Sequence, residues 1–339
     1  MKAIGFTKSL SADHPDSLVD LNLPNPAAAG RDLLVRIEAV SVNPIDTKIR
    51  RRGDQPEPKI LGFDASGTIE AVGPEVTLFR PGDAVFYAGS VVRPGTNSEY
   101  HLVDERIVGR KPAKLTYAEA AALPLVSITA WELFFDRIGI DAGGRDAGKH
   151  VLIIGGAGGV GSIAIQLAKW AGLTVTATAS RPETVAWVKI LGADYVIDHR
   201  QPLPPQAFAL GIKEYDFIAN LVDTDGYWEA TIELIKPQGR IGALVDAKVP
   251  LDLNPLKHKS AGFVWEQMFI RSTFTTPDIQ KQHDLLGKVA DLIDAGTLRA
   301  ILTETFAPIN AANLRAAHLR LESGTTIGKI ALAGFPQGI

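Results

Sequence analysis

The stretch that decides the fold is VLIIGGAGGVGS, at residues 151–162. Four apolar residues lead into five glycines, and apolar residues then return. Gly156, Gly158 and Gly161 fit the spacing G-x-G-x-x-G, which points to a nucleotide only between a strand and a helix. The apolar run predicts that strand, and VGSIAIQLAKWAG predicts a helix that ends at Gly172.

Each glycine of this pattern has a physical task. The first permits a tight turn, the second lets the backbone approach a pyrophosphate, and the third lets helix and strand pack closely. The N–H groups and the dipole at the start of the helix favour an anion. We therefore expect this segment to hold a dinucleotide, and a glycine-rich turn without a ligand is the alternative. The expected contacts are Gly156, Gly158, Gly159, Val160 and Gly161.

The end of the next predicted strand indicates which dinucleotide binds. An NAD site places Asp or Glu there, about 20 residues further on, to hold the ribose 2′-hydroxyl. In this chain the strand TVTATAS runs into Ser180 and Arg181, and no acid stands there. A hydroxyl beside a guanidinium suits a 2′-phosphate. We therefore expect NADPH; the alternative is that Arg181 is a solvated residue before the next helix.

Strands and helices alternate in the middle of the chain. Apolar strand patterns recur at HVLIIGG, TVTATAS, YVIDH, YDFIANLVD and GRIGALVD, with helical patterns between most of them. Such repeated units predict a parallel sheet with helices on both faces. The Pro-rich QPLPPQ at 201–206 is expected to be a surface loop.

The first part of the chain has another character. Up to about Leu125, short apolar runs are punctuated by Gly and Pro, which predicts a β-rich domain. We expect residues 1–125 and 301–339 to form this substrate domain, and residues 126–300 to form the nucleotide-binding domain. The 339 residues are enough for two domains of roughly 150 residues each.

Composition excludes several classes of function. The absence of cysteine rules out disulfides, cysteine-ligated zinc and a cysteine nucleophile. A net charge of −3 gives no general attraction to nucleic acid or to a membrane. The N-terminal MKAIGFTKSLSADHP lacks the apolar core of a signal peptide. We expect a cytoplasmic protein whose ligands are small molecules.

Several stretches together resemble the medium-chain dehydrogenase/reductase superfamily over nearly the whole length. They are SVNPIDTKIRR, GFDASGTIEAVG, PGDAVFYAG, EYHLVDE, AAALPLVSITAWELF, GGAGGVGSIAIQLAK and LGADYVIDH. The chain looks most like the quinone oxidoreductase branch and its zinc-type alcohol dehydrogenase-like members. The resemblance implies an α/β protein, with a GroES-like β-rich substrate domain and a Rossmann dinucleotide-binding domain.

The resemblance also shows where a zinc ion would bind in other members. A Cys stands there at the position of Asn43, and a His-Glu pair at Phe63-Asp64. Asn43 and Phe63 are not credible zinc ligands, and the cysteine-rich lobe that holds a structural zinc is missing. We expect no metal. Without a metal as Lewis acid, the protein can still transfer a hydride to an acceptor that is already electrophilic, because the cofactor itself carries that chemistry.

Three residues are candidates for the catalytic site. The Asn43 amide is expected to donate to a carbonyl oxygen or to position the nicotinamide ribose, or else to be a turn residue before Pro44. Asp46 is either a partner of that site or a cap of a short helix. Some enoyl reductases of the superfamily use a Tyr as proton donor where this chain has Gly53-Asp54-Gln55. Tyr87 is the nearest substitute as proton donor, with packing as its alternative; solvent or the ribose hydroxyl are other proton sources.

Further cofactor contacts follow from the resemblance alone. Thr129 matches a residue near the nicotinamide. His199 matches a position near the adenosine phosphate, with a polar strand end as the alternative. Asn220 is expected where the cleft opens at the carboxyl ends of the strands. Lys329 matches a residue of a family motif by its position only, and the alternative is an ordinary surface lysine. Arg50, Arg51 and Arg52 form a basic run that is expected to be a solvated face. The aromatic residues of GFVWEQMF are expected to pack or to line a contact.

These features predict a zinc-independent, NADPH-dependent reductase of quinones or α,β-unsaturated carbonyls. The alternatives are an enoyl-thioester reductase and a low-turnover NADPH-binding protein with a structural or RNA-binding role; the missing basic patch argues against RNA. As in relatives, a strand near ALVDAKVPLDL, residues 243–253, is expected to pair with its mate in a homodimer.

Overall fold

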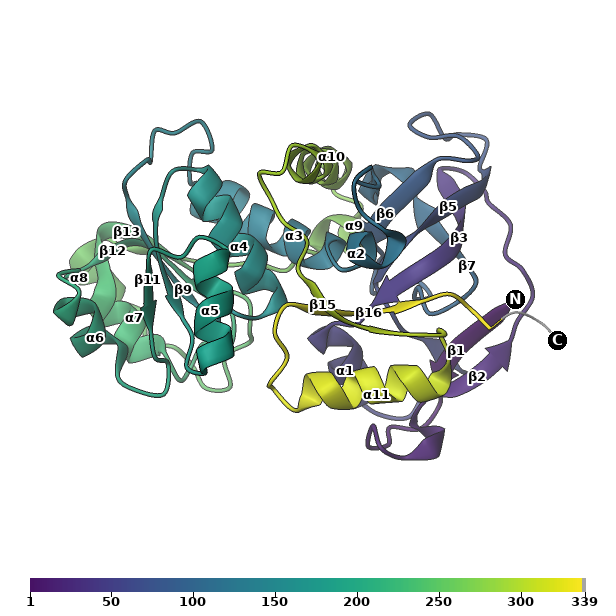
Figure 1. Cartoon of the computed structure of the whole chain (residues 1–339), viewed down its shortest axis with the longest axis horizontal. Coiled ribbons are helices and arrows are strands. Elements are labelled where there is room, and N and C mark those ends of the chain that lie inside the picture. Colours follow the sequence, from purple (N-terminus) through teal and green to yellow (C-terminus); the bar gives the residue numbers. More distant parts are fainter. Residues whose placement is uncertain (337–339) are drawn as a thin grey trace. The chain divides into compact units, whose positions relative to one another are not determined.

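The computed structural model describes residues 1–336, and the chain forms two compact units (Figure 1). Unit 1 comprises Met1–Ile128 and the segment from Phe269 onward, and unit 2 comprises Thr129–Met268. The helix α3 (Pro124–Trp131) crosses the boundary between them and continues as a π-helix, η3 (Glu132–Ile138).

Unit 2 is a doubly wound sheet of parallel strands in the order β11-β10-β9-β12-β13-β14. Figure 1 shows α4 and α5 on one side of the strands and α6, α7 and α8 on the other. This confirms the predicted Rossmann architecture. The strands are β9 (His150–Ile154), β10 (Thr174–Thr178), β11 (Tyr195–Ile197), β12 (Tyr215–Asn220), β13 (Ile235–Ala243) and β14 (Gly262–Trp265). The helices are α4 (Gly159–Trp170), α5 (Pro182–Ile190), α6 (Leu203–Ala209), α7 (Trp228–Leu234) and α8 (Asn254–Lys259).

The central strand β9 explains why this part of the sequence is so apolar. Its residues from Val151 to Ile154 are fully buried, as expected for a parallel strand covered on both faces. The strand order reverses between β9 and β12, where Ile154 pairs with Asn220. In open α/β sheets a ligand binds beyond the carboxyl ends of the strands at such a reversal.

Unit 1 is built on a seven-stranded sheet in the order β15-β16-β3-β5-β6-β8, with β7 paired to β3, and on a small sheet, β2-β1-β4. The large sheet contains β3 (Asp32–Ser41), β5 (Asp64–Val72), β6 (Ala84–Ala88), β7 (Tyr100–Asp104), β8 (Val108–Arg110), β15 (Leu302–Phe306) and β16 (Lys329–Ala333). The small sheet contains β1 (Lys2–Phe6), β2 (Val19–Asn22) and β4 (Lys59–Ile60). The helices are η1 (Pro15–Ser17), α1 (Pro44–Arg50), η2 (Glu105–Ile107), α2 (Tyr117–Ala121), α9 (Ile270–Phe274), α10 (Lys281–Asp294) and α11 (Ala311–Glu322).

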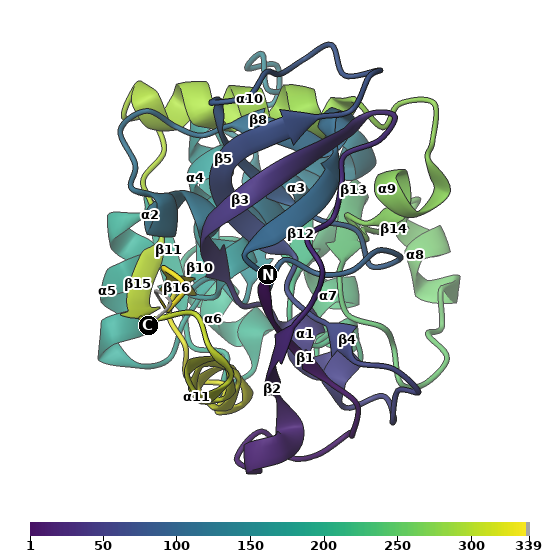
Figure 2. The same cartoon turned by 90° about the vertical axis from the view of Figure 1, so that its right-hand side faces the viewer.

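The second boundary between the units lies after Met268, earlier than the expected position at residue 300. The reason is α10, which packs on β8 and η2 of unit 1 (Figure 2). Gly109 of β8 makes this contact possible, because a Cβ there would come within 2.6 Å of the Leu286 Cβ. A helical pattern in a sequence does not show which sheet the helix covers.

Three expectations about surface segments are wrong. Residues 203–206 of the Pro-rich stretch begin the helix α6, because prolines in a first helical turn lose no hydrogen bond. Residues 244–253 contain no strand, and the edge strand of the unit 2 sheet is β14. Arg50 is fully buried rather than solvated, since its guanidinium bonds to His318, Leu10 and Glu322, whereas Arg51 and Arg52 are exposed.

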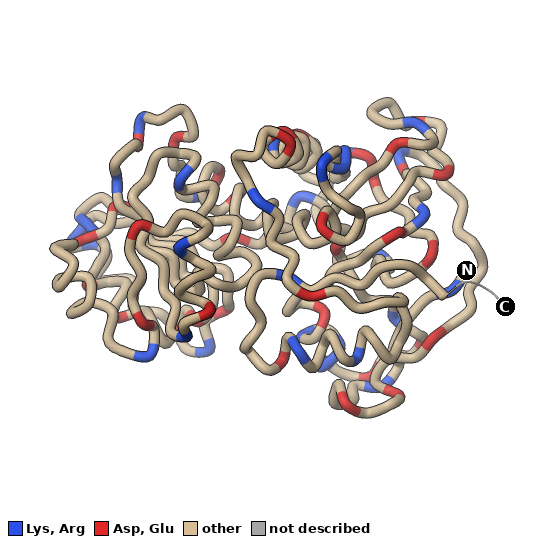
Figure 3. The backbone as a smooth tube through the Cα atoms, in the orientation of Figure 1, with Lys and Arg blue, Asp and Glu red and all other residues tan. Residues whose placement is uncertain are grey.

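One helical stretch, Tyr117–Ile138, is long and apolar enough to cross a membrane, but 78% of its apolar window is buried inside the protein. Such burial is typical of a core helix. Acidic and basic residues are interspersed along the backbone of both units (Figure 3).

Candidate functional site

A cluster of buried polar side chains lies at the start of α1 in unit 1. Asn43, Asp46, Asp64 and Lys329 are each at most 4% exposed. Asn43 and Asp46 belong to the first turn of α1, Asp64 begins β5, and Lys329 begins β16. The adjacent strand β3 links the last two, since Ser41 pairs with Asp64 in β5 and with Ala331 in β16.

The Lys329 ammonium is the centre of this cluster. It donates to Asn43 Oδ1 at 2.6 Å, to the Val42 carbonyl at 2.7 Å and to Asp64 Oδ2 at 3.1 Å. Three donors on a buried ammonium thus meet three acceptors. The Asp64 carboxylate also accepts hydrogen bonds from Asn43 Nδ2 at 2.8 Å and from the Leu125 N–H at 2.7 Å. An ion pair at this depth persists only with such full hydrogen bonding.

Burial shifts the pKa values of this cluster toward neutral forms. It raises the pKa of Asp64 and lowers that of Lys329, while their mutual attraction opposes both shifts. Burial also raises the pKa of the Asp46 carboxyl to about 7. The Asp46 oxygens accept the Asn43 N–H at 2.7 Å and the Gly62 N–H at 3.0 Å. Asp46 therefore caps α1 and ties it to the segment before β5.

This geometry limits what the Asn43 side chain can do. Its oxygen accepts from Lys329 and its amide nitrogen donates to Asp64, with a second, longer contact to the Ser41 carbonyl at 3.5 Å. The strong hydrogen bonds of the amide are thus already made inside unit 1. Lys329 likewise belongs to unit 1, and its donors go to this cluster rather than outward.

Tyr87 of β6 is fully buried. Its hydroxyl lies 3.0 Å from His101 Nδ1, and the two rings stack. His101 Nε2 lies 3.0 Å from the Pro94 carbonyl, so this nitrogen carries the proton and Nδ1 accepts from Tyr87. Burial lowers the pKa of His101 to about 4, which keeps the imidazole neutral. The hydroxyl is thus engaged by an internal partner.

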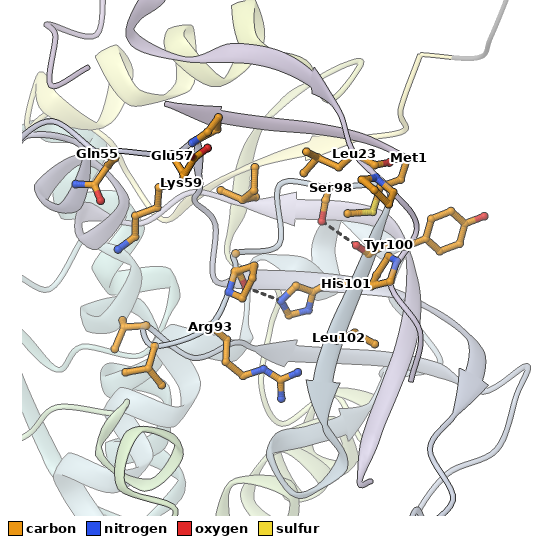
Figure 4. A pocket seen from close by; sticks show the side chains of 18 of the residues that line it. Met1, Leu23, Gln55, Glu57, Lys59, Arg93, Ser98, Tyr100, His101 and Leu102 are labelled. Atoms are coloured by element: carbon orange, nitrogen blue, oxygen red, sulfur yellow. Dashed lines mark hydrogen bonds between the residues drawn. The ribbon is translucent and has the colours of Figure 1, made fainter. Parts of the chain in front are cut away.

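A groove of about 930 Å³ lies on unit 1 beside this pair (Figure 4). His101 forms part of its wall, together with Arg93, which pairs with Asp32, and Ser98, which donates to the Tyr100 carbonyl. The charged side chains of Glu57 and Lys59 also line it. The remaining lining is dominated by prolines and aliphatic residues from three segments, 23–26, 55–60 and 91–95.

The glycine loop of unit 2 has the predicted form, since α4 begins at Gly159 with Gly158 as its N-cap. A Cβ on Gly161 would lie 2.2 Å from the Gly155 carbonyl oxygen, so this position requires glycine for helix and strand to pack. A Cβ on Gly158 would meet only that same oxygen, at 3.7 Å. The space in front of Gly158 is therefore open, as a close approach of pyrophosphate to the backbone requires.

The carboxyl ends of β10 and β11 bring together three of the predicted residues and a fourth that the sequence reasoning missed. Ser180 Oγ lies 3.2 Å from His199 Nε2. Arg200 donates from Nη2 to the Ser180 carbonyl at 2.9 Å. Arg181 follows as the N-cap residue of α5, with its Nε 3.3 Å from Glu183 Oε1. Adjacency to His199 was the only sequence signal for Arg200.

The other predicted residues of unit 2 lie at its helix and strand ends. Val160 is in the first turn of α4, and Thr129 is buried in α3 at the start of the unit. Asn220 ends β12, as expected, but its amide caps the following turn: Nδ2 donates to the Asp223 carbonyl at 2.7 Å.

Comparisons with known proteins agree with this architecture. Residues 29–124 match the family model "Alcohol dehydrogenase GroES-like domain", and residues 191–332 match "Zinc-binding dehydrogenase". A zinc-type alcohol dehydrogenase-like protein of Staphylococcus aureus, SAR2277, is 45% identical over 98% of this chain and 99% of its own. The crystal structure of a putative zinc-dependent alcohol dehydrogenase from Rhizobium etli is 52% identical, with a TM-score of 0.95 and 99% of both chains covered. The 2-methylene-furan-3-one reductase of Solanum lycopersicum is 30% identical over 99% of this chain and 80% of its own.

The residues of this chain do not fit the zinc ion that the names of the Staphylococcus aureus and Rhizobium etli proteins imply. The sequence has no cysteine. Phe63 is an apolar side chain packed against Phe269, with ring centroids 5.1 Å apart. Asn43 and Asp64 already share the ammonium of Lys329. Within residues 1–336, no three His, Cys, Asp or Glu side chains are grouped so that they could hold a metal ion.

Proposed function

Since the chain belongs to the medium-chain dehydrogenase/reductase superfamily, we propose that it is a zinc-independent, NADPH-dependent reductase of α,β-unsaturated carbonyls and quinones. The observation that carries this proposal is the Lys329 ammonium between Asn43 and Asp64. A positive charge of the protein itself fills the place where the resemblance locates a metal. Acceptors that need no Lewis acid are therefore favoured.

When bound, NADPH supplies a hydride from its nicotinamide ring. The acceptor takes the hydride at its electrophilic carbon and a proton from water or a polar side chain, which gives the saturated carbonyl or the hydroquinone. Quinones are themselves conjugated enones, so one site can serve both classes. The name of the tomato relative, a 2-methylene-furan-3-one reductase, supports a conjugated acceptor. The apolar groove of unit 1 offers a surface on which such a molecule can bind.

We assign the cofactor to unit 2. Gly156, Gly158 and Gly161 would accept the pyrophosphate at the start of α4. Ser180 and Arg181 would hold the 2′-phosphate at the end of β10, where no acid competes for a ribose hydroxyl.

The experiment is NADPH oxidation by protein treated with a chelator, followed at 340 nm with a quinone, a short enone and an enoyl thioester, and with NADH in parallel. We expect turnover of the quinone or the enone with NADPH, much less with NADH, and no gain on adding zinc. Ser180→Asp should reverse the preference between the two nucleotides, because it restores the acid that NAD sites use. Activity only after addition of zinc, or with the thioester alone, would contradict the proposal.

We further propose that two copies of the chain pair through β14. In the part of the chain that the structure describes, β14 pairs with no strand besides β13, so it is an edge strand of the sheet. Phe263 and Trp265 stand on β14, with ring centroids 4.9 Å apart, and Trp265 is 45% exposed. Light scattering tests this: a monomer mass at micromolar concentration would end the proposal, and a dimer that Val264→Pro converts to monomer would support it.

A further inference from the structure

The Arg200 guanidinium donates hydrogen bonds to Asp198 and to the Ser180 carbonyl, and some of its N–H groups remain unused. Nε lies 3.1 Å from both oxygens of Asp198, and Nη2 donates to Asp198 Oδ2 at 2.7 Å and to the Ser180 carbonyl at 2.9 Å. A guanidinium has five N–H groups, and these bonds use the one on Nε and the two on Nη2. Within residues 1–336, the two N–H groups of Nη1 have no hydrogen-bond partner.

The arginine is also held in place. Asp198 accepts the Arg200 backbone N–H at 2.9 Å, and its own N–H donates to Gln206 Oε1 at 2.8 Å. The bonds from Arg200 hold the pKa of Asp198 down to about 2, so this carboxylate stays ionised. The Arg200 side chain is nevertheless 61% exposed. A cation that is both fixed and accessible loses little conformational entropy when it binds an anion.

The Nη2 bond to the Ser180 carbonyl places Arg200 beside three residues whose side chains can donate hydrogen bonds. Ser180 presents a hydroxyl and His199 an imidazole, and Arg181 stands next in the chain. Two carboxylates lie in the same area: Asp198 is paired with Arg200, and Glu183 with Arg181. Each of these negative charges is thus matched by a positive one, while Nη1 of Arg200 keeps its two donors for a further anion.

We propose that Arg200 is a specificity-determining residue, which binds the ribose 2′-phosphate of NADPH through Nη1 together with Ser180 and Arg181. The inference rests on the proposed use of NADPH and adds a residue from the following strand end to that site. The Asp198 carboxylate then orients the guanidinium and does not repel the ligand, because both of its oxygens are occupied by Arg200.

The test measures nucleotide binding without turnover. Binding of 2′,5′-ADP and of 5′-AMP to the full chain is measured by calorimetry, since the two probes differ only in the 2′-phosphate. We expect the wild type to prefer 2′,5′-ADP. Arg200→Gln should weaken 2′,5′-ADP about 10-fold, because it removes charge-assisted bonds to the phosphate, and should leave 5′-AMP unchanged. Arg200→Lys should recover only part of the loss, since a point charge replaces a planar fork.

Arg145→Gln is the matched control. Arg145 is an exposed arginine of unit 2 whose side chain has no hydrogen-bond or ion-pair partner within residues 1–336, so its removal changes net charge equally. The control should keep the wild-type preference. The proposal is overturned if Arg200→Gln keeps that preference, if Arg145→Gln loses as much, or if the wild type binds both probes equally. A protein that prefers 2′,5′-ADP through Arg200 but reduces no acceptor would contradict the proposed reaction only.

Discussion

The two polar clusters of this protein use their charges in opposite ways. In unit 1, Lys329 is buried and its three donors end on acceptors of the same unit. In unit 2, Arg200 is exposed and, among residues 1–336, two of its N–H groups have no partner. A cluster whose donors all end inside the protein fixes the backbone and side chains around it. A cluster with donors to spare can bind an anion. Residue type alone does not separate these roles, since both clusters join a cation to an aspartate.

Removal of the buried Lys329 ammonium should have the largest effect on folding stability. Lys329→Met leaves Asp64 as a buried carboxylate without its ion-pair partner, and breaking such a pair costs about 3–5 kcal/mol of unfolding free energy. Urea unfolding followed by tryptophan fluorescence measures the loss. The double variant Lys329→Met/Asp64→Asn should recover part of the stability, because the unpaired charge is gone. A single variant as stable as the wild type would show that the cluster does not hold unit 1 together.

A smaller loss of folding stability is expected from a substitution in the glycine loop. Gly161→Ala puts a Cβ against the backbone carbonyl of Gly155, and overpacking of this kind costs about 1–3 kcal/mol. Gly158→Ala meets open space, so it should change stability much less and still weaken NADPH binding. Urea unfolding and NADPH fluorescence titration test both variants. Equal losses of stability would mean that the loop is not packed as described.

The next effect depends on pH and concerns His318, which lies against Arg50 with Nδ1 3.3 Å from Nε. Burial lowers the pKa of His318 to about 3, from 6.5 in the unfolded chain. Between these values the unfolded state binds more protons, so this residue makes stability fall as the pH falls below 6.5. His318→Gln should reduce the slope by up to about 1.4 kcal/mol per pH unit between pH 4.5 and 6. The exposed His258→Gln serves as control, and identical slopes for all three proteins would refute the assignment.

The smallest effect on stability is expected at Arg200. Its ion pair with Asp198 is exposed, and such pairs contribute little to folding. Arg200→Gln should leave the urea midpoint unchanged while it reduces the affinity for 2′,5′-ADP. A clear loss of stability would place Arg200 with Lys329, as a residue that holds its unit together.

Most of the fold could be predicted from local patterns. The run from Val151 to Ser162 predicted β9 and α4, and strand and helix patterns further on predicted the doubly wound sheet. Such predictions succeed because periodicity and turn residues are local properties of a chain. They failed where the outcome depends on neighbours distant in sequence. The partner sheet of α10 and the burial of Arg50 under α11 are of this kind.

The candidate site shows the same division. The sequence by itself determined the glycine loop, the missing acid after β10 and the lack of cysteine, because each is a statement about residue identity and spacing. Only the tertiary structure decided that Lys329 meets Asn43 and Asp64 from 286 and 265 positions away. It also decided that Arg200, after β11, bonds to Ser180 at the end of the neighbouring strand β10. Hydrogen bonds between distant segments depend on strand order and register, which no local pattern contains.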